Sequence, residues 1–295
     1  MAESGVVVVD KPADWTSHDV VARTRGLART RRVGHAGTLD PMATGVLVLG
    51  IEKGTKLLGH LTLTDKTYEA TIRLGLTTDT DDAEGEPGVR RDASGVSEEA
   101  VGVAVEKLTG RIRQVPPQVS AIKVEGRRAY KSAREGKKVA LEPREVTVSE
   151  FEVTDVRRVS DDDGEFVDVD AVITCSSGTY IRSLARDMGT DLGVGGHLTA
   201  LRRTRVGPYD LSRARTLDQL AEEFTQVPLA EAVAAAFPRR VLTEQETRRI
   251  QHGNRIEPGG SAGGPVGLFA PDGRVVALGE DRRDHTRPVV VFEPA

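Results

Sequence analysis

The chain has 295 residues, of which 38% are hydrophobic and 29% are charged, and its formal net charge is -4 at pH 7. This length predicts one large domain and a smaller one, and this balance is typical of a soluble globular protein. No apolar run approaches the ~20 residues that a membrane helix needs. A single cysteine, Cys175, excludes an intrachain disulfide and a multi-cysteine zinc site. With no signal peptide visible before the first strand, we expect a cytoplasmic protein.

Charge is unevenly distributed along the chain. Two groups of arginines stand apart from the acidic residues, which gather at 79–86 and 161–163. Segregated charge of this kind can bind a polyanion despite the negative total; the alternative is that both groups are solvated faces. The clustered arginines are Arg23, Arg25, Arg29, Arg31 and Arg32 in the first group and Arg202, Arg203 and Arg205 in the second.

Short apolar or alternating runs predict the strands. Residues 5–12 form a buried strand that ends at a proline. Residues 66–74 alternate between polar and apolar side chains, with Tyr68 and Ile72 on the apolar face. Taken alone, a tyrosine that faces the core is explained by packing. The other predicted strands are residues 46–51, 111–124 with an interruption at 116–117, 146 onward, 166–175, 197–205, 266–269, 274–278 and 288–292.

Residues at helical spacing predict the helices. Ser17 is the expected N-cap of the first helix. A later helix at 178–188 begins right after a strand and carries Tyr180 and Arg182 in its first turn. The remaining predicted helices are residues 53–61, 97–108, 128–135, 216–224 and 243–251. The acidic, turn-rich residues 77–88 are predicted to form a loop.

The order of these elements indicates the fold class. Strands and helices mix without a strict βαβ order, which favours an α+β protein with helices on one large mixed or antiparallel sheet. An alanine-rich connector at 227–238 indicates a domain boundary. We therefore predict one domain at 1–236 and a small β-rich domain at 237–295, with a turn at 271–273.

One glycine-rich stretch, Gly34-His-Ala-Gly-Thr-Leu-Asp-Pro-Met-Ala-Thr-Gly45, holds a single carboxylate, Asp40. Glycines let a backbone turn sharply and approach a ligand closely, and Pro41 keeps Asp40 out of helical geometry. The stretch leads into the apolar run 46–49, a buried element that can hold it still. Taken alone, it is either a stiff loop that presents one acid or an ordinary glycine-rich turn.

Several common chemistries lack their motifs. The chain has no Gly-x-x-x-x-Gly-Lys-Ser/Thr phosphate loop, no Gly-x-Gly-x-x-Gly after its first strand and no His-Glu-x-x-His. Its six histidines are scattered. Sequence order leaves a Ser-His-Asp triad open, although no Gly-x-Ser-x-Gly elbow is present. We therefore expect neither a metal site nor a bound cofactor.

Four separated pieces form the strongest remaining pattern: Lys11-Pro12, the Asp40 loop, Lys66-x-Tyr68, and Gly178-Thr-Tyr-Ile-Arg182 followed by His197-Leu-x-x-Leu201-Arg202-Arg203. Together they resemble the bacterial TruB-type tRNA pseudouridine synthases, and the resemblance covers essentially the whole chain. It implies the pseudouridine synthase fold, a large mixed, mainly antiparallel sheet flanked by helices. It also implies a small, β-rich, PUA-like RNA-binding domain at the C-terminus.

The resemblance implies that uridine 55 in the T loop of tRNA is isomerised to pseudouridine. Asp40 matches the catalytic aspartate, which attacks C1′ of the ribose or C6 of the uracil, and the sequence leaves that choice open. Arg182 matches the arginine that pairs with this aspartate, since a close guanidinium opposes the rise in pKa that burial would cause. Tyr68 matches the tyrosine that stacks on the target base and is placed for proton transfer at C5. No cofactor is needed, because the reaction involves no redox change and no external group.

Other matched residues surround the base. Tyr180 and Leu201 match the lining of the uracil pocket. His35 matches a histidine that takes part in extruding the base, a step that costs about a few kcal/mol; its alternative role is a loop histidine bonded to backbone. Lys11 matches a supporting position near the substrate. Arg202 belongs to the arginine clusters, which on this resemblance contact phosphates.

Three further positions are notable. Lys56 and Asp82 match recurrent family positions with a supporting role. Asp14 is a departure, because many relatives have glycine after Lys-Pro-x, and this puts the local turn in doubt.

We expect tRNA, bound through its T-arm, as the partner, with no membrane, no obligate protein partner and a monomeric chain. A rival hypothesis is an RNA-folding factor for which catalysis is dispensable; the two roles can coexist.

Overall fold

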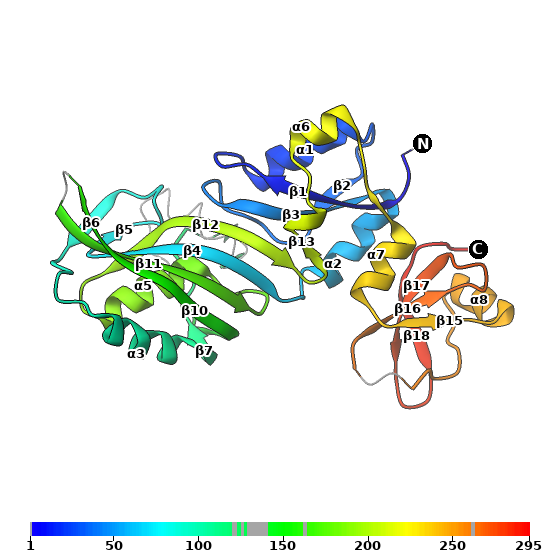
Figure 1. Ribbon diagram of the computed structural model, residues 1–295. Coiled ribbons are helices and arrows are strands. Elements are labelled where there is room, and N and C mark those ends of the chain that lie inside the picture. Colours follow the sequence, from blue (N-terminus) through cyan, green and yellow to red (C-terminus); the bar gives the residue numbers. More distant parts are fainter. Residues whose placement is uncertain (1, 120–122, 125–126, 129–140, 162–163, 261–262) are drawn as a thin grey trace. The chain divides into compact units, whose positions relative to one another are not determined.

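The computed structural model describes residues 2–119, 123–124, 127–128, 141–161, 164–260 and 263–295 (Figure 1). The chain forms two compact units, which we call the first and the second unit. The first unit comprises Met1–Asp40, Gly45–Leu63 and Val206–Ala295, and the second comprises Pro41–Thr44 and Thr64–Arg205. Of the helix predicted at 128–135, only residue 128 lies within the described residues.

A largely antiparallel sheet is the framework of the second unit, with its strands in the order β12–β4–β11–β10–β7. Alternate residues of β4 are buried, as the sequence predicts, and Tyr68 lies opposite Ile173 of β11. Helix α3 packs on β10 and α5 packs on β4 (Figure 1). The elements are β4 (Lys66–Leu74), β5 (Leu76–Thr78), β6 (Pro87–Arg90), α3 (Glu98–Leu108), β7 (Gly110–Gln114), β8 (Lys123–Val124), β9 (Arg127–Arg128), β10 (Arg144–Asp161), β11 (Gly164–Cys175), α5 (Ile181–Asp191) and β12 (Gly196–Val206).

The first unit begins with strands that pair β14–β1–β3, with β2 also on β3. Val8 lies opposite Val48 in the antiparallel pair of β1 and β3, and both are buried. The elements are β1 (Gly5–Lys11), α1 (Ser17–Leu27), β2 (Val33–His35), β3 (Thr44–Ile51), the 3-10 helix η1 (Glu52–Leu57), α2 (Leu58–Leu61), β13 (Tyr209–Asp210), the 3-10 helix η2 (Leu211–Arg213), α6 (Leu217–Glu222), β14 (Val227–Pro228) and α7 (Leu229–Ala236).

The C-terminal part of the first unit is a separate four-stranded sheet in the order β15–β16–β17–β18, covered by α8. Buried side chains of this C-terminal part, including Phe269 of β16 and Phe292 just after β18, join Val6, Leu57 and Val233 in one apolar cluster. The boundary at 236/237 therefore falls between elements of one compact unit, and the division into two domains there stays a prediction. The elements are β15 (Arg239–Val241), α8 (Glu244–Gln251), β16 (Pro265–Phe269), β17 (Val275–Asp281) and β18 (Thr286–Val291).

The predicted α+β class is confirmed, but three local predictions are wrong. Residues 227–238 are not a plain connector, because α7 lies within them and buries Ala232; alanine is the strongest helix former. Thr16, not Ser17, is the N-cap of α1. Residues 77–88 are not only loop, because β5 and β6 pair there. In the described part of the chain, no helix is long and apolar enough to cross a membrane.

Candidate active site

The start of helix α1, which follows β1, contacts the Asp40 loop. Thr16 caps α1, because its hydroxyl accepts from the Asp19 backbone N–H at 3.1 Å and its own N–H donates to the Asp19 carboxylate at 3.0 Å. The next residue, Ser17, is 1% exposed. Its Oγ accepts from the Leu39 N–H at 2.9 Å and donates to the Leu39 carbonyl at 3.1 Å. The first turn of the helix thus holds the residue before Asp40.

The turn between β1 and α1 accommodates Asp14 in a left-handed backbone conformation. Asp14 has φ +64°, the left-handed region in which glycine is favoured and aspartate is tolerated. Lys11 is fully buried, and its Nζ donates to the carbonyls of Pro12 at 2.8 Å and Trp15 at 2.6 Å. The side chain of Lys11, a predicted supporting residue, therefore stabilises this turn by binding two of the turn's backbone carbonyls.

The Asp40 loop itself combines main-chain pairing with a glycine turn. His35 ends β2 opposite Leu49, and the Ala36 N–H donates to the Val48 carbonyl at 2.9 Å. Gly37 has φ +88°, so a residue with a side chain would be strained there. Asp40 is half-buried at the end of this turn. A loop of this form can present one carboxylate to a ligand.

His35 also touches helix α1. Its ring meets that of His18 edge to face, with centroids 5.6 Å apart and an interplanar angle of 76°. Ser17 and His18 are adjacent in the first turn of α1, so this turn contacts the loop at two points.

Arg182 lies in the first turn of α5, in the second unit, and is 5% exposed. Its guanidinium donates to the carbonyls of Thr80 at 2.9 Å and Val119 at 3.0 Å. One terminal nitrogen is 3.3 Å from the Asp82 carboxylate, which is also buried. Removing two charges from water is costly unless they pair and their remaining hydrogen bonds are made, so these contacts hold the guanidinium in one orientation.

A second ion pair lies beside this one. Asp81 is 3.1 Å from Arg186 of the same helix. Burial raises the pKa of Asp81, while the positive charges of Arg186 and Arg182 oppose that rise. The start of α5 is thus bound to the segment 80–82 by two adjacent arginine–aspartate pairs.

Gln114 is a buried residue that the sequence analysis missed. Its side-chain amide donates to the Tyr180 carbonyl at 3.0 Å and accepts from the Tyr180 N–H at 2.8 Å. Tyr180 is the N-cap of α5, so Gln114 joins the end of β7 to the start of the helix that carries Arg182. No motif marks this glutamine, because its partner is 66 residues away.

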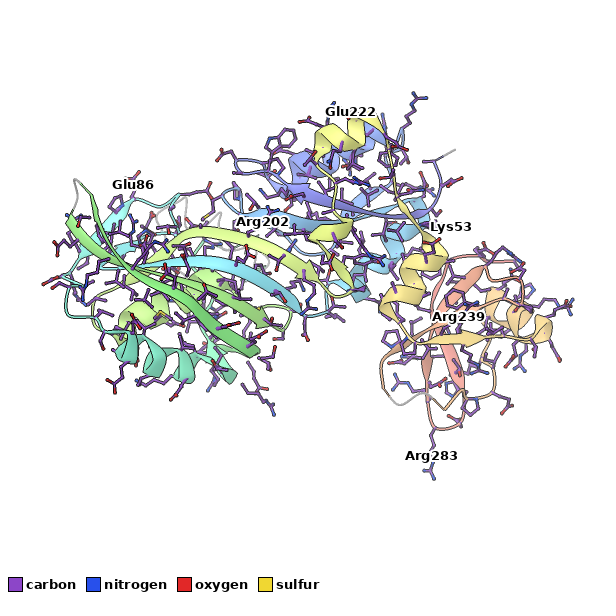
Figure 2. The ribbon with its side chains drawn as sticks, viewed as in Figure 1. Lys53, Glu86, Arg202, Glu222, Arg239 and Arg283 are labelled. Atoms are coloured by element: carbon purple, nitrogen blue, oxygen red, sulfur yellow. The ribbon has the colours of Figure 1, made fainter. Side chains whose placement is uncertain are left out.

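Other predicted residues of the second unit lie on two neighbouring strands. Tyr68 on β4 is 7% exposed, and Leu201 on β12 is 8% exposed. Arg202, labelled in Figure 2, donates to the Thr44 hydroxyl at 3.3 Å. Lys66 shares the buried face of β4 with Tyr68. Burial, reinforced by the nearby charge of Arg203, lowers the pKa of Lys66 to about 8.

The two arginine clusters differ in exposure. Arg25, Arg29 and Arg31 line an open hollow of about 690 Å³ with Gly26 and Thr30. In the second cluster Arg203 is 1% exposed, so it does not fit the expected contact with a phosphate.

The structure assigns the predicted site residues to both units. Lys11, His35 and Asp40 belong to the first unit; the second contains Tyr68, Tyr180, Arg182, Leu201 and Arg202. Lys56, another predicted supporting residue, donates from Nζ to the Val291 carbonyl at 2.8 Å and so joins η1 to β18. Among the described residues, no group of three or more His, Cys, Asp or Glu could hold a metal ion.

Solved structures share this fold. The chain is similar to one in the structure of an H/ACA RNP bound to a substrate RNA containing 2′-deoxyuridine, with a TM-score of 0.73 and 25% identity over 98% of this chain and 85% of that one. It is also similar to one in a Cbf5–Nop10–Gar1 complex, with a TM-score of 0.74 and 26% identity over the same shares of the two chains, 98% and 85%.

Family models cover the Asp40 loop and most of the chain. Residues 25–181 match the TruB family pseudouridylate synthase N-terminal domain, residues 182–247 the tRNA pseudouridylate synthase B C-terminal domain, and residues 237–293 the tRNA pseudouridine synthase II C-terminal domain. The fold and the family models thus define a pseudouridine synthase.

Curated relatives are similar over their whole length. The tRNA pseudouridine synthase B of Thermobifida fusca (strain YX) is 69% identical over 98% of both chains. The protein of that name from Streptomyces coelicolor is 59% identical over 98% of this chain and 97% of its own. The chain belongs to the TruB family of pseudouridylate synthases, which confirms the resemblance that its motifs indicated.

Proposed function

We propose that this protein converts uridine 55 in the T loop of tRNA to pseudouridine, with Asp40 as the nucleophile. The Asp40 loop carries the proposal, because it presents one half-buried carboxylate from a backbone held on both sides of a glycine turn. The relatives named tRNA pseudouridine synthase B support tRNA as the substrate.

The reaction needs a nucleophile and a way to hold the detached base. Asp40 forms a covalent bond to C1′ of the ribose or to C6 of the uracil. The glycosidic N–C bond breaks, the base turns, and a C–C bond forms from C5 to C1′. The bond between Asp40 and the nucleoside also breaks, which restores the free carboxylate. C5 then loses its proton and N1 gains one, so the product has the same atoms and oxidation state as the substrate.

Each remaining residue has a role in this scheme. Arg182 supplies the positive charge that keeps the nucleophile ionised, and its buried contacts to Asp82, Thr80 and Val119 support this role because they hold its orientation. Tyr68 stacks on the uracil and assists proton transfer at C5.

The rest of the site receives and extrudes the base. Tyr180 and Leu201 line the uracil pocket, and His35 fills the space that the extruded base leaves in the T loop. Lys11 acts through the turn that it holds. Arg202 and the arginines around the hollow contact phosphates, for which the guanidinium fork is suited.

The test uses unmodified tRNA and maps pseudouridine by position. Wild-type protein should modify position 55, and Asp40→Asn should abolish the reaction while binding stays within severalfold, because phosphate contacts dominate affinity. Asp218→Asn, an exposed change on α6, is the matched control and should react normally. Full activity of Asp40→Asn would refute the assigned nucleophile.

The arginine-lined hollow also favours a second role, assistance in tRNA folding, because it can bind RNA without Asp40. Asp40→Asn should then still speed the refolding of misfolded tRNA. If the Asp40→Asn protein loses both pseudouridine formation and tRNA refolding, the separate folding role is contradicted.

A further inference from the structure

One buried hydroxyl satisfies both backbone groups of the residue before Asp40. Ser17 Oγ accepts from the Leu39 N–H at 2.9 Å and donates to the Leu39 carbonyl at 3.1 Å. Both residues are buried, at 1% exposure for Ser17 and 3% for Leu39. A buried N–H and C=O must each find a partner, so this hydroxyl defines where the Leu39 backbone lies.

The hydroxyl is itself on a rigid support. Ser17 is the first residue of α1, and the reciprocal bonds between Thr16 and Asp19 set where that helix begins. Val20 and Val21 anchor the same turn in the core. The position of the Ser17 hydroxyl is therefore fixed by the start of α1.

The residues on either side of Asp40 make the direction of its carboxylate depend on the contact between Ser17 and Leu39. Glycine permits many backbone conformations on one side, at Gly37. On the other side Pro41 has no N–H to offer and restricts Asp40 to extended geometry. The orientation of the peptide group between Leu39 and Asp40 then decides where the carboxylate points.

We propose that Ser17 is a positioning residue for the reaction, which aims the Asp40 carboxylate through the main chain of Leu39. This inference rests on the proposed function, because it requires Asp40 to be the reacting group. A nucleophile displaced by about 1 Å can lose roughly a hundredfold in rate, so the hydroxyl should act on the chemical step rather than on RNA binding.

The test compares three variants of the full chain on an unmodified T-arm RNA. Ser17→Ala removes the hydroxyl, and Ser17→Thr keeps one in the same place. Thr24→Ala is the matched control, because Thr24 is also buried on α1, yet its hydroxyl donates only within the helix, to the Val20 carbonyl at 2.8 Å. For wild type and each variant, the experiment measures the single-turnover rate at saturating protein, the Kd for the RNA and the folded fraction at the assay temperature.

The expected result separates positioning from folding. Ser17→Ala should react about 10- to 100-fold more slowly per folded molecule, with a Kd within about twofold of wild type, and Ser17→Thr should recover most of the rate. Thr24→Ala should lose stability but keep the rate per folded molecule. An unchanged single-turnover rate in Ser17→Ala, or an equal loss in Thr24→Ala, would overturn the inference.

A failure of the proposed function has a different signature. If wild-type protein forms no pseudouridine in the T-arm RNA, the proposed function is wrong whatever Ser17 does. If wild type reacts and Ser17→Ala reacts equally fast, the function stands and only the positioning role is refuted.

Discussion

The two units hold their proposed site residues by different physical means. In the first unit, the segment before Asp40 is held by a neutral hydroxyl and by main-chain pairing, and the carboxylate itself is half-buried. In the second unit, Arg182 is 5% exposed and is held by a buried carboxylate and two carbonyls. A buried charge loses its hydration and needs partners in the protein, whereas a half-buried acid keeps part of its hydration.

This difference predicts unequal costs of substitution. The second unit should be sensitive to loss of any partner in its buried network, because each loss removes a contact from a buried charge or amide. The first unit should tolerate changes around Asp40 better in stability than in activity. The predictions below test this contrast, from the largest expected effect on stability to the smallest.

Asp82→Ala should be the most destabilising change, lowering the free energy of unfolding by about 3–5 kcal/mol because it removes a buried carboxylate that lies 3.3 Å from the buried Arg182 guanidinium. Glu145→Ala is the matched control. Glu145 pairs with Arg111 in the same unit, but both side chains of this ion pair are exposed. The control change should alter the free energy of unfolding far less, because an exposed ion pair contributes little. Denaturant titration of both variants measures the difference, and equal losses would contradict the role of burial.

Lys66 should give the second unit a stability that depends on pH. Its pKa falls from 10.5 to about 8 on folding, chiefly because it is buried, so between these values the unfolded chain binds more protons than the folded protein. The free energy of unfolding should therefore rise with pH from about 8 to 10.5, by up to about 3 kcal/mol from this residue. Lys66→Met should remove that rise, while Lys107→Met, at an exposed lysine, should preserve it. Identical pH profiles for wild type and Lys66→Met would refute the assignment.

Gln114→Ala should lower the free energy of unfolding by about 2 kcal/mol, because the Tyr180 N–H loses the side-chain oxygen to which it donates and the Tyr180 carbonyl loses one of its donors. Gln245→Ala, on the exposed side of α8, should have almost no effect. The two variants are compared by thermal unfolding. If Gln114→Ala is as stable as the control, the amide does not fasten α5 to β7.

Thr16→Ala and Thr243→Ala should each cost only about 1 kcal/mol, since each threonine caps a helix of the first unit with the same reciprocal pattern. The two should differ in reaction rate. Thr16 precedes the serine that holds Leu39, so its loss should slow turnover per folded molecule, whereas loss of the α8 cap should not. Equal turnover in both variants would show that the start of α1 does not influence Asp40.

Much of the fold was predictable because its signals are local. Alternation in 66–74 places Tyr68 on the buried face of β4, and the helix after β11 carries Tyr180 and Arg182 at its start, as expected. The alanine-rich stretch that looked like a connector is α7, because its weak apolar pattern finds a core in the C-terminal sheet. A short segment cannot reveal which distant surface will bury it.

The sequence by itself determined the family, the Asp40 loop and the elements that bear Tyr68, Arg182 and Leu201, because motifs and periodicities lie within short stretches of chain. Tertiary structure alone decided that Ser17 binds Leu39 across 22 residues rather than capping its helix, and that Gln114 clamps Tyr180 across 66. It also decided that Arg203 is buried while Arg25 lines an open hollow. The physical reason is that a polar side chain takes its role from the partners that the fold brings to it, and neighbours in sequence do not specify those partners.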